Sequence, residues 1–215
     1  MNRTELLNEV RHLIGDTAGP TYAWTDARLI AWLSEGQDKF CESSGFWSDK
    51  RSYDITTVLG QQDYPISDRI ISIRSIYDGG RKLINATDLT IAEADFSTLS
   101  TQAPVNYVMG QSTGYVTFLE PVIAGVVLDL WVHRRSLVPF SIANENPEIP
   151  EQFHLAMAEY AAYKAFGDHD RELQDPVKAT DHFANFKRYC MDGKLAYRRL
   201  TGEYTDVVPS PLYVV

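Results

Sequence analysis

Apolar residues recur at helical spacing near the beginning of the chain. The pattern predicts one helix over about Thr4 to Ile14 and a second helix that ends near Cys41. Gly15 stands where a left-handed helix end is expected, and Thr25 is placed to cap the second helix. These signals predict a helical hairpin over residues 1–46.

The apolar spacing changes from the helical period to a period of two at Trp47. Such alternation indicates strands, and Asp78-Gly79-Gly80 indicates a hairpin turn. We expect a β-rich domain at 47–146, with several short antiparallel strands and one small helix from Thr87 or Asp88 to about Phe96. The segments with the clearest alternation are 53–58, 69–77, 114–119 and 126–134.

Two prolines, Pro147 and Pro150, mark the return to helical sequence. The residue before each proline is held extended, and Pro150 suits the first position of a helix, where its missing N–H costs nothing. Helices are predicted from Glu151 to about Phe166 and from Pro176 to about Leu200. The first of these carries apolar residues on two faces, as a helix at the centre of a bundle does.

Together these segments predict an α+β fold with four parts. Residues 1–46 and 147–200 are expected to form one helical bundle, and the antiparallel β-sheet domain at 47–146 is inserted between them. Residues 201–215 are expected to form an extended C-terminal tail.

The tail is predicted to dock onto another subunit. Its prolines exclude a helix, and it is too apolar for a typical disordered segment. Apolar residues around prolines suit a groove or a sheet edge of a partner, whereas the alternative is a tail that folds back on its own domain. The residues predicted to bind the partner are Tyr204, Val207, Val208, Pro209, Pro211, Leu212, Tyr213, Val214 and Val215.

The chain is acidic, with 20 Lys and Arg residues against 29 Asp and Glu residues and a net charge of −9. Tight nucleic-acid binding depends on Lys and Arg side chains that neutralise phosphates, so this balance argues against it. An acidic wall repels the phosphate backbone. The same balance therefore suits a channel through which DNA passes.

The sequence gives no sign of membrane association. No apolar run approaches the roughly 20 residues that span a bilayer, and the N-terminus lacks the apolar stretch of a secretion signal. Cys41 and Cys190 are expected to be free, partly buried thiols in a reducing compartment rather than a disulfide.

No motif indicates catalysis, a cofactor or a metal site. The sequence contains no Gly-rich phosphate loop, Gly-x-Ser-x-Gly elbow, His-Glu-x-x-His or paired Cys-x-x-Cys. The polar run 167–172 would suit a metal or acid–base site, but no other ligands converge on it, so we interpret it as a solvated loop. The pair Glu148 and Glu151 would suit a glycoside hydrolase, yet chance pairs are plentiful among 29 acids.

Three basic clusters occur at 133–135, 187–188 and 198–199. We interpret them as charges at strand and helix ends, since cations are favourable near the negative end of a helix dipole. The alternative is that they contact phosphates or an acidic partner.

Several short motifs follow one another in a characteristic order. They are Glu5 to Asp16, Trp24 to Leu33, Val58 to Ile66, Tyr77 to Gly80 and Pro147 to His154. Together they resemble the head–tail connector (adaptor, or head completion) proteins of tailed bacteriophages, which form a ring beneath the portal. The resemblance covers residues 1 to about 200.

The resemblance implies a structural protein of the virion rather than an enzyme. Such a protein assembles as a dodecameric ring, with the portal protein above it and a tail, nozzle or tail-completion protein below. Its C-terminal segment binds the portal, a role that we carry over to Tyr204 through Val215. DNA passes through the ring without specific binding, and assembly takes place in the host cytoplasm.

Two other functions remain open at this point. A nucleic-acid-binding module would use Arg134, Arg135, Lys187 and Arg188 and would show salt-sensitive affinity for DNA. A muralytic enzyme would use acidic residues and would clear cell-wall substrate.

Overall fold

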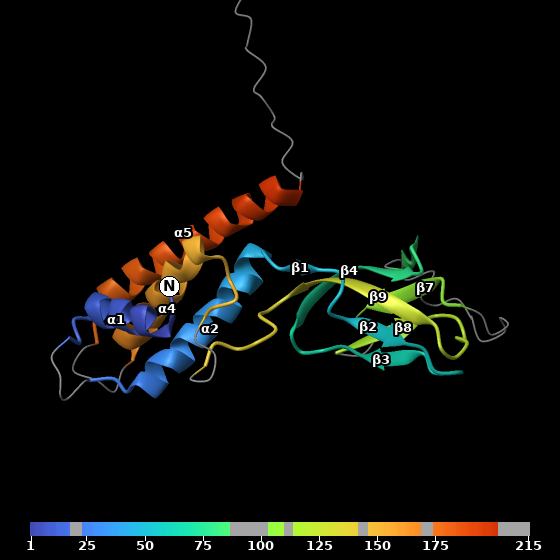
Figure 1. Ribbon diagram of the computed structural model, residues 1–215, viewed down its shortest axis with the longest axis horizontal. Helices are drawn as coiled ribbons and strands as arrows, with labels where there is room; N and C mark the ends of the chain where they lie inside the picture. Colours follow the sequence, from blue (N-terminus) through green and yellow to red (C-terminus); the bar gives the residue numbers. More distant parts are fainter. Residues whose placement is uncertain (18–22, 87–102, 110–113, 142–145, 169–173, 202–215) are drawn as a thin grey trace, which may run out of the picture. The chain divides into compact units, whose positions relative to one another are not determined.

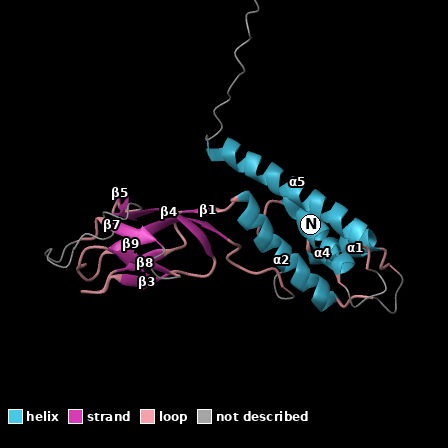
Figure 2. Cartoon of the chain, turned by 180° about the vertical axis from the view of Figure 1, so that it is seen from behind, coloured by secondary structure: helices cyan, strands magenta, loops and turns pink. Residues whose placement is uncertain are grey.

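The computed structural model describes residues 1–17, 23–86, 103–109, 114–141, 146–168 and 174–201 (Figure 1). The chain divides into two compact units. Residues 1–46 and the residues from Val138 onward make one of them, which we call the helical unit, and Trp47–Leu137 make the other, the β unit. In Figure 2 the described helices all belong to the helical unit and the strands to the β unit. The predicted α+β class is therefore confirmed.

In the helical unit, α4 packs against α1, α2 and α5. Its small side chains allow this, since Ala158, Ala161, Ala162 and Ala165 are all buried. The two apolar faces predicted for this segment thus correspond to a helix with neighbours on more than one side. The described elements are α1 (Arg3–Ile14), α2 (Asp26–Ser44), the 3-10 turn η1 (Glu151–Phe153), α4 (His154–Gly167) and α5 (Pro176–Thr201).

The ends of α1 and α2 follow from local capping chemistry. The Asn2 side chain accepts a hydrogen bond from the Glu5 backbone N–H at 3.0 Å, and the Glu5 carboxylate accepts one from the Asn2 N–H at 2.9 Å. This is a capping box. Thr25 caps α2 through its hydroxyl, and Gly15 ends α1 with a φ of 72°, so both predicted caps are confirmed.

The helix predicted from Glu151 begins later than expected. Residues Glu151–Phe153 form the 3-10 turn η1, and α4 starts at His154. Pro150 precedes the turn rather than occupying the first helical position. His154, at the start of α4, is buried, and its imidazole lies 2.9 Å from the Ile149 carbonyl oxygen.

Gly193 lies where α5 closely approaches α2. A Cβ atom at this position would lie 2.6 Å from Cζ of Phe40 and 3.2 Å from Cβ of Ser44. The Phe40 ring cannot easily move aside, because it is fully buried and packs on Phe153 at a centroid distance of 5.1 Å. Glycine is thus required here by packing rather than by backbone conformation.

We expect Gly193→Leu to lower the free energy of unfolding of the helical unit by about 3 kcal/mol, the upper end of the cost of overpacking a core. Far-ultraviolet circular dichroism in a urea titration measures this loss. Lys194→Ala, at the exposed neighbouring position, serves as the control and should change stability by less than about 0.5 kcal/mol. An unchanged midpoint for Gly193→Leu would mean that α5 can move away from α2 at no cost.

The β unit contains two sheets. The first has the order β1-β9-β4-β5, with β2 also paired to β9, and all of its pairs are antiparallel. The second has the order β3-β8-β7-β6, and only β6 and β7 are parallel among its described pairs. The strands are β1 (Ser48–Asp49), β2 (Asp54–Thr56), β3 (Asp63–Pro65), β4 (Ile70–Asp78), β5 (Arg81–Lys82), β6 (Ile84–Asn85), β7 (Asn106–Met109), β8 (Tyr115–Phe118) and β9 (Val127–Arg134).

One core cluster joins the two sheets of the β unit. Leu128, Leu130 and Val132 alternate inward along β9 with Asp129 and Trp131 outward, as the sequence pattern predicts. The second sheet contributes Tyr107, Val116 and Phe118 to the same cluster. This alternation gives the β unit a dry side and a polar side.

Strand β4 departs from the clean alternation expected at 69–77. Its register against β9 shifts between Ile70 and Ser72 and again between Ile73 and Ser75. As a result the neighbours Ser75 and Ile76 are both buried, a pattern that a regular strand does not allow. The small helix predicted from Thr87 or Asp88 lies outside the described residues.

Cys41 and Cys190 are both buried thiols rather than partners in a disulfide, as expected. Burial raises the pKa of the Cys190 thiol to about 11. The thiol is therefore protonated and unreactive at neutral pH.

Candidate assembly interfaces

The residues predicted to bind the portal, Tyr204 to Val215, lie outside the described residues. The last described residue is Thr201, the end of α5. Three surfaces of the described chain remain as places where a partner would bind: the exposed side of α5, a groove beside α2, and the polar side of the first sheet.

The start of α5 follows the predicted capping pattern. The Asp175 carboxylate accepts hydrogen bonds from the backbone N–H groups of Val177 and Lys178, each at 3.1 Å. Pro176 is the first residue of the helix, as expected. The inner side of α5 is buried against α4 and α2, through Ala179, Phe186, Cys190, Gly193 and Tyr197.

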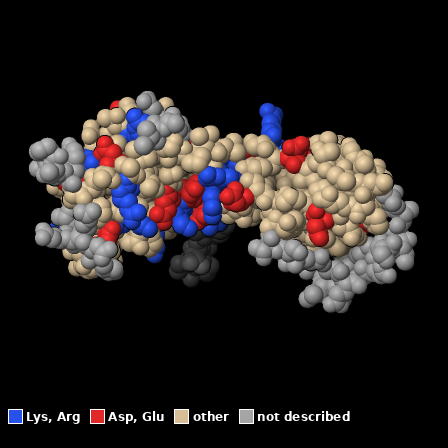
Figure 3. Space-filling model, turned by 90° about the horizontal axis from the view of Figure 1, so that it is seen from below, with Lys and Arg blue, Asp and Glu red and all other residues tan. Residues whose placement is uncertain are grey.

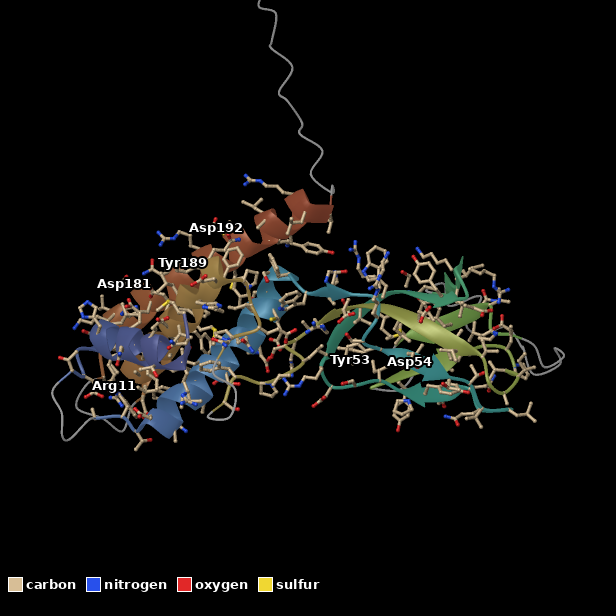
Figure 4. All side chains as sticks on the ribbon, in the orientation of Figure 1. Arg11, Tyr53, Asp54, Asp181, Tyr189 and Asp192 are labelled. Carbon is tan, nitrogen blue, oxygen red and sulfur yellow. The ribbon has the colours of Figure 1, made fainter. Side chains whose placement is uncertain are left out.

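The side of α5 opposite these residues exposes apolar groups. Arg188, Met191, Leu195 and Arg199 recur at helical spacing on that side, and we call them the outer stripe. The Met191 side chain is 67% exposed and that of Leu195 is 38% exposed. Asp192 lies next to the stripe and is labelled in Figure 4.

The second half of α5 is also the most basic part of the chain. Residues 187 to 199 contain five Lys and Arg residues and one Asp residue, in a protein with a net charge of −9. Cations near the end of a helix favour the negative end of the dipole. That preference does not account for exposed Met and Leu side chains among them.

A groove of about 770 Å³ runs beside the first half of α2. Its floor includes Ile30 and Phe140, which are nearly buried, and carboxylates from Glu35 and Asp38 stand in its lining. We call this the α2 groove. Its lining residues are Ala27, Ile30, Ala31, Ser34, Glu35, Asp38, Phe140 and Ser141.

The Glu35 carboxylate in this groove is held ionised. Burial by itself would raise its pKa, but the Tyr160 hydroxyl, which donates to it at 2.7 Å, and the Lys164 ammonium, at 3.2 Å, lower the pKa below its usual value. No Lys or Arg side chain lines the groove among the described residues. The groove therefore has an apolar floor, and its lining carries two carboxylates, of which that of Glu35 is paired with Lys164.

The polar side of the first sheet carries a Trp131 side chain between cations. The Lys50 ammonium lies 3.9 Å and the Arg74 guanidinium 4.6 Å from the centroid of its ring. Such cation–π contacts hold the indole in place. A small pocket of about 210 Å³ beside it is lined by Lys50, Tyr77, Gly80, Asp129 and Trp131.

A protein-family model described as SU10 adaptor protein matches residues 1–208. The chain belongs to the SU10 adaptor protein family. This is a family of phage head–tail adaptors, structural proteins of the virion, so the resemblance seen in the sequence motifs is confirmed. A comparison with curated proteins gives no match.

In this SU10 adaptor, the four basic residues of the nucleic-acid hypothesis lie in two different units. Arg134 is buried in the β unit, where its guanidinium pairs with Asp49 at 2.7 Å and lies over the Trp47 ring. It is therefore engaged and not available to a phosphate. Lys187 and Arg188 are exposed on α5.

In the view of Figure 3, the described residues of the helical unit show no continuous basic surface. Lys and Arg side chains alternate there with Asp and Glu side chains over the helical unit. A duplex-binding surface requires cations in a continuous patch or stripe. This face therefore lacks the charge pattern of a DNA-binding module.

The ion pair of Asp49 and Arg134 gives the adaptor a pH-dependent contribution to stability. Burial alone would raise the pKa of Asp49, but hydrogen bonds from the Ser52 hydroxyl, the Arg51 backbone N–H and the Arg134 guanidinium lower it to about 2. The usual pKa of an unfolded Asp is about 3.9. Between these values the unfolded chain binds a proton that the folded protein does not, so this stabilisation is complete above about pH 4 and is lost toward pH 2.

We therefore expect Asp49→Asn to be less stable than the wild type above pH 4, with a difference that shrinks as the pH falls toward 2. Urea midpoints from tryptophan fluorescence, measured at several pH values, test this. Asp68→Asn changes an exposed carboxylate of the same unit and serves as the control. Equal pH profiles for the two variants would contradict the assignment of this pH-dependent stability to Asp49.

Among the described residues, the other sites considered from the sequence do not come together as a catalytic or metal centre. Glu151 is exposed, and its carboxylate accepts a hydrogen bond from the Met1 amino group at 3.1 Å, while the Glu148 backbone N–H donates to Gln37. Within the described ranges, no three His, Cys, Asp or Glu side chains gather as metal ligands would. Most of the polar run 167–172 lies outside those ranges.

In the part of the chain that the structure covers, no helix combines the length and the apolar content needed to cross a bilayer.

The outer stripe and the α2 groove were not identified from the sequence. The stripe has a signal there, because Arg188, Met191 and Leu195 follow at steps of three and four on the side opposite the core residues. The groove has no such signal. It depends on Phe140, which approaches α2 only in the folded chain.

Proposed function

We propose that this adaptor forms a dodecameric ring that joins the portal to the tail and lines the channel for DNA. The family match over residues 1–208 carries the proposal, because it establishes a head–tail adaptor. In the proposed ring, the portal lies above and a tail, nozzle or tail-completion protein lies below.

The C-terminal residues Tyr204 to Val215 would bind the portal. They follow directly on α5, whose inner side is anchored on α4 and α2 along its length. A segment that leaves a rigid helix starts from a defined position. Its apolar residues would dock into a groove of the portal or pair with an edge of one of its sheets. The tail is thus the part of the chain proposed to set the symmetry of the ring.

The charge of the chain suits the channel. A net charge of −9 gives the ring a negative field, which repels the phosphate backbone and disfavours adhesion of DNA to the wall. The proposal therefore includes passage of DNA without specific binding.

The experiment that tests the proposal is a mass measurement by light scattering on a sizing column. The adaptor is measured alone and after mixing with the portal ring encoded with it. We expect a complex in which the number of adaptors matches the number of portal subunits. A free protein that is monomeric would show that the portal templates the ring, because lateral contacts alone then do not offset the entropy of association.

The nucleic-acid-binding alternative makes a different prediction in the same experiment. An adaptor that ignores the portal but is retained on DNA at low salt, with retention lost as salt rises, would replace the proposed function. Because Arg134 is engaged with Asp49, this outcome would depend on Lys187 and Arg188, which are exposed on α5.

A further inference from the structure

We propose that the outer stripe of α5 in one copy packs into the α2 groove of the next copy around the ring. The inference rests on the ring of the proposed function and names its lateral contact. It is carried by the match between two surfaces that the described part of the chain leaves exposed.

The side chains of the two surfaces are complementary in size. Met191 and Leu195 are exposed on α5 and lie four residues apart, about 6 Å along the axis. The α2 groove offers short side chains at Ala27 and Ala31, over a floor that includes Phe140. Two bulky apolar side chains on a helix are the kind of anchors that enter such a groove.

The charges of the two surfaces are also opposite. Arg188 and Arg199 flank the apolar pair on α5, whereas Glu35 and Asp38 line the α2 groove. Complementary charges of this kind select the partner and set its orientation. A negatively charged chain repels copies of itself at long range, so a contact between copies needs such a local match.

The stripe cannot fill the groove of its own copy. The opposite side of α5 packs on α2, with Gly193 against Phe40 and Ser44, so the stripe faces away from α2. In Figures 1 and 2 α5 and the first half of α2 lie on different sides of α4. Contact between two different patches on successive copies is heterologous, and a heterologous contact closes into a ring when its rotation permits.

The charges exclude one other arrangement. Two outer stripes packed on each other would bring together the basic halves of two α5 helices, and like charges at an interface oppose association. The acidic lining of the α2 groove removes that conflict. The stripe-to-groove contact is therefore preferred to a symmetric dimer.

Cysteine cross-linking on the portal ring tests the contact. The double variant Ala31→Cys/Leu195→Cys places one thiol in the groove and one on the stripe, and disulfides form only when the two Cα atoms come within about 7 Å. The native Cys41 and Cys190 are buried and do not compete. We expect most of the monomer band to shift into a ladder of covalent oligomers when the portal is present.

The matched control is Ala31→Cys/Lys178→Cys. Lys178 is exposed on the same helix but lies about a quarter turn away from Leu195 and near the other end. We expect this variant to stay monomeric on denaturing gels. Equal cross-linking, or equal absence of it, in the two variants would overturn the stripe-to-groove contact.

Leu195→Glu provides a second measurement that does not depend on disulfide chemistry. The residue is exposed, so the variant should fold with an unchanged melting temperature. We expect it to need more than tenfold higher concentration to fill the portal, because each copy then binds without help from its neighbours. Unchanged filling would count against the contact.

The outcomes separate this inference from the proposed function. If the wild type does not form a ring on the portal, the proposed function is wrong and the lateral contact is wrong with it. If the ring forms but Ala31→Cys/Leu195→Cys stays monomeric, only the lateral contact is wrong. If Arg188→Glu forms the ring normally and loses retention on DNA at low salt, the stripe binds nucleic acid instead.

Discussion

Ending the chain after Gly202 is expected to abolish portal binding while the folded units remain intact. The described helices end at Thr201, so the truncated chain keeps every helix and strand that the structure describes. It loses the nine residues predicted to contact the portal. Each Val or Leu side chain contributes roughly 1.5–3 kcal/mol when it is fully buried, so the loss of only two such contacts weakens binding by more than about 100-fold.

Comigration with the portal ring on a sizing column measures this loss, and a thermal melt shows that the fold is kept. Thr205→Ala/Ser210→Ala in the full chain is the matched control, because it changes polar tail positions and leaves the apolar ones in place. This control should bind like the wild type. Unchanged binding by the truncated chain would show that the portal contacts another part of the adaptor.

Asp16→Ala is expected to destabilise the helical unit by about 3 kcal/mol or more. The Asp16 carboxylate is buried and pairs with the buried Arg11 guanidinium at 2.8 Å. It also accepts hydrogen bonds from the backbone N–H groups of Ala23 and Trp24. Removal of one partner of a buried pair costs about 3–5 kcal/mol, because the charge that stays behind is poorly compensated.

A second carboxylate near Arg11, that of Asp26, limits the stability lost in Asp16→Ala. Asp26 lies 2.5 Å from the guanidinium but is largely exposed, so water weakens this contact. We therefore expect the double variant Arg11→Met/Asp16→Ala to lose less stability than the sum of the two single variants. Urea titrations followed by circular dichroism give all three values.

An exposed ion pair of the same unit is the control for this cycle. Glu42→Ala removes the partner of Lys39, at 2.8 Å on the surface of α2. Such pairs contribute between about 0 and 1 kcal/mol. A loss for Asp16→Ala as small as that for Glu42→Ala would mean that the Arg11 site relaxes or admits water.

The helix ends could be predicted from the sequence because their chemistry is local. Thr25 caps α2 through a neighbour three residues away, and Asp175 caps α5 through neighbours two and three residues away. Gly15 ends α1 through its own backbone conformation. Each signal lies within one turn of helix, so no distant contact is needed to read it.

The strands could be predicted only where their pairing is regular. Strand β9 keeps the period of two because it lies between neighbours in the middle of its sheet. Strand β4 breaks the period, because two register shifts against β9 bury Ser75 and Ile76 together. A bulge depends on the partner strand, which the sequence of β4 alone does not contain.

The candidate interfaces also differ in how far the sequence alone predicts them. The tail, Tyr204 to Val215, is predicted from its composition, and both its extended form and its portal contact remain predictions. The α2 groove could not be recognised, because its floor combines Ile30 with Phe140, and these residues are far apart in the chain. The ion pair of Arg134 could not be predicted either, since its partner Asp49 comes from a different strand.

The sequence by itself determined the α+β class, the helix caps, the alternation of β9 and membership of the adaptor family, because local spacing and motif order carry these features. The tertiary structure alone decided the position of Gly193 against Phe40, the bulges of β4, the burial of Arg134 and the existence of the α2 groove. Each of these depends on which distant side chains meet in a close-packed interior, and that meeting is set by the packing of whole elements rather than by any local pattern.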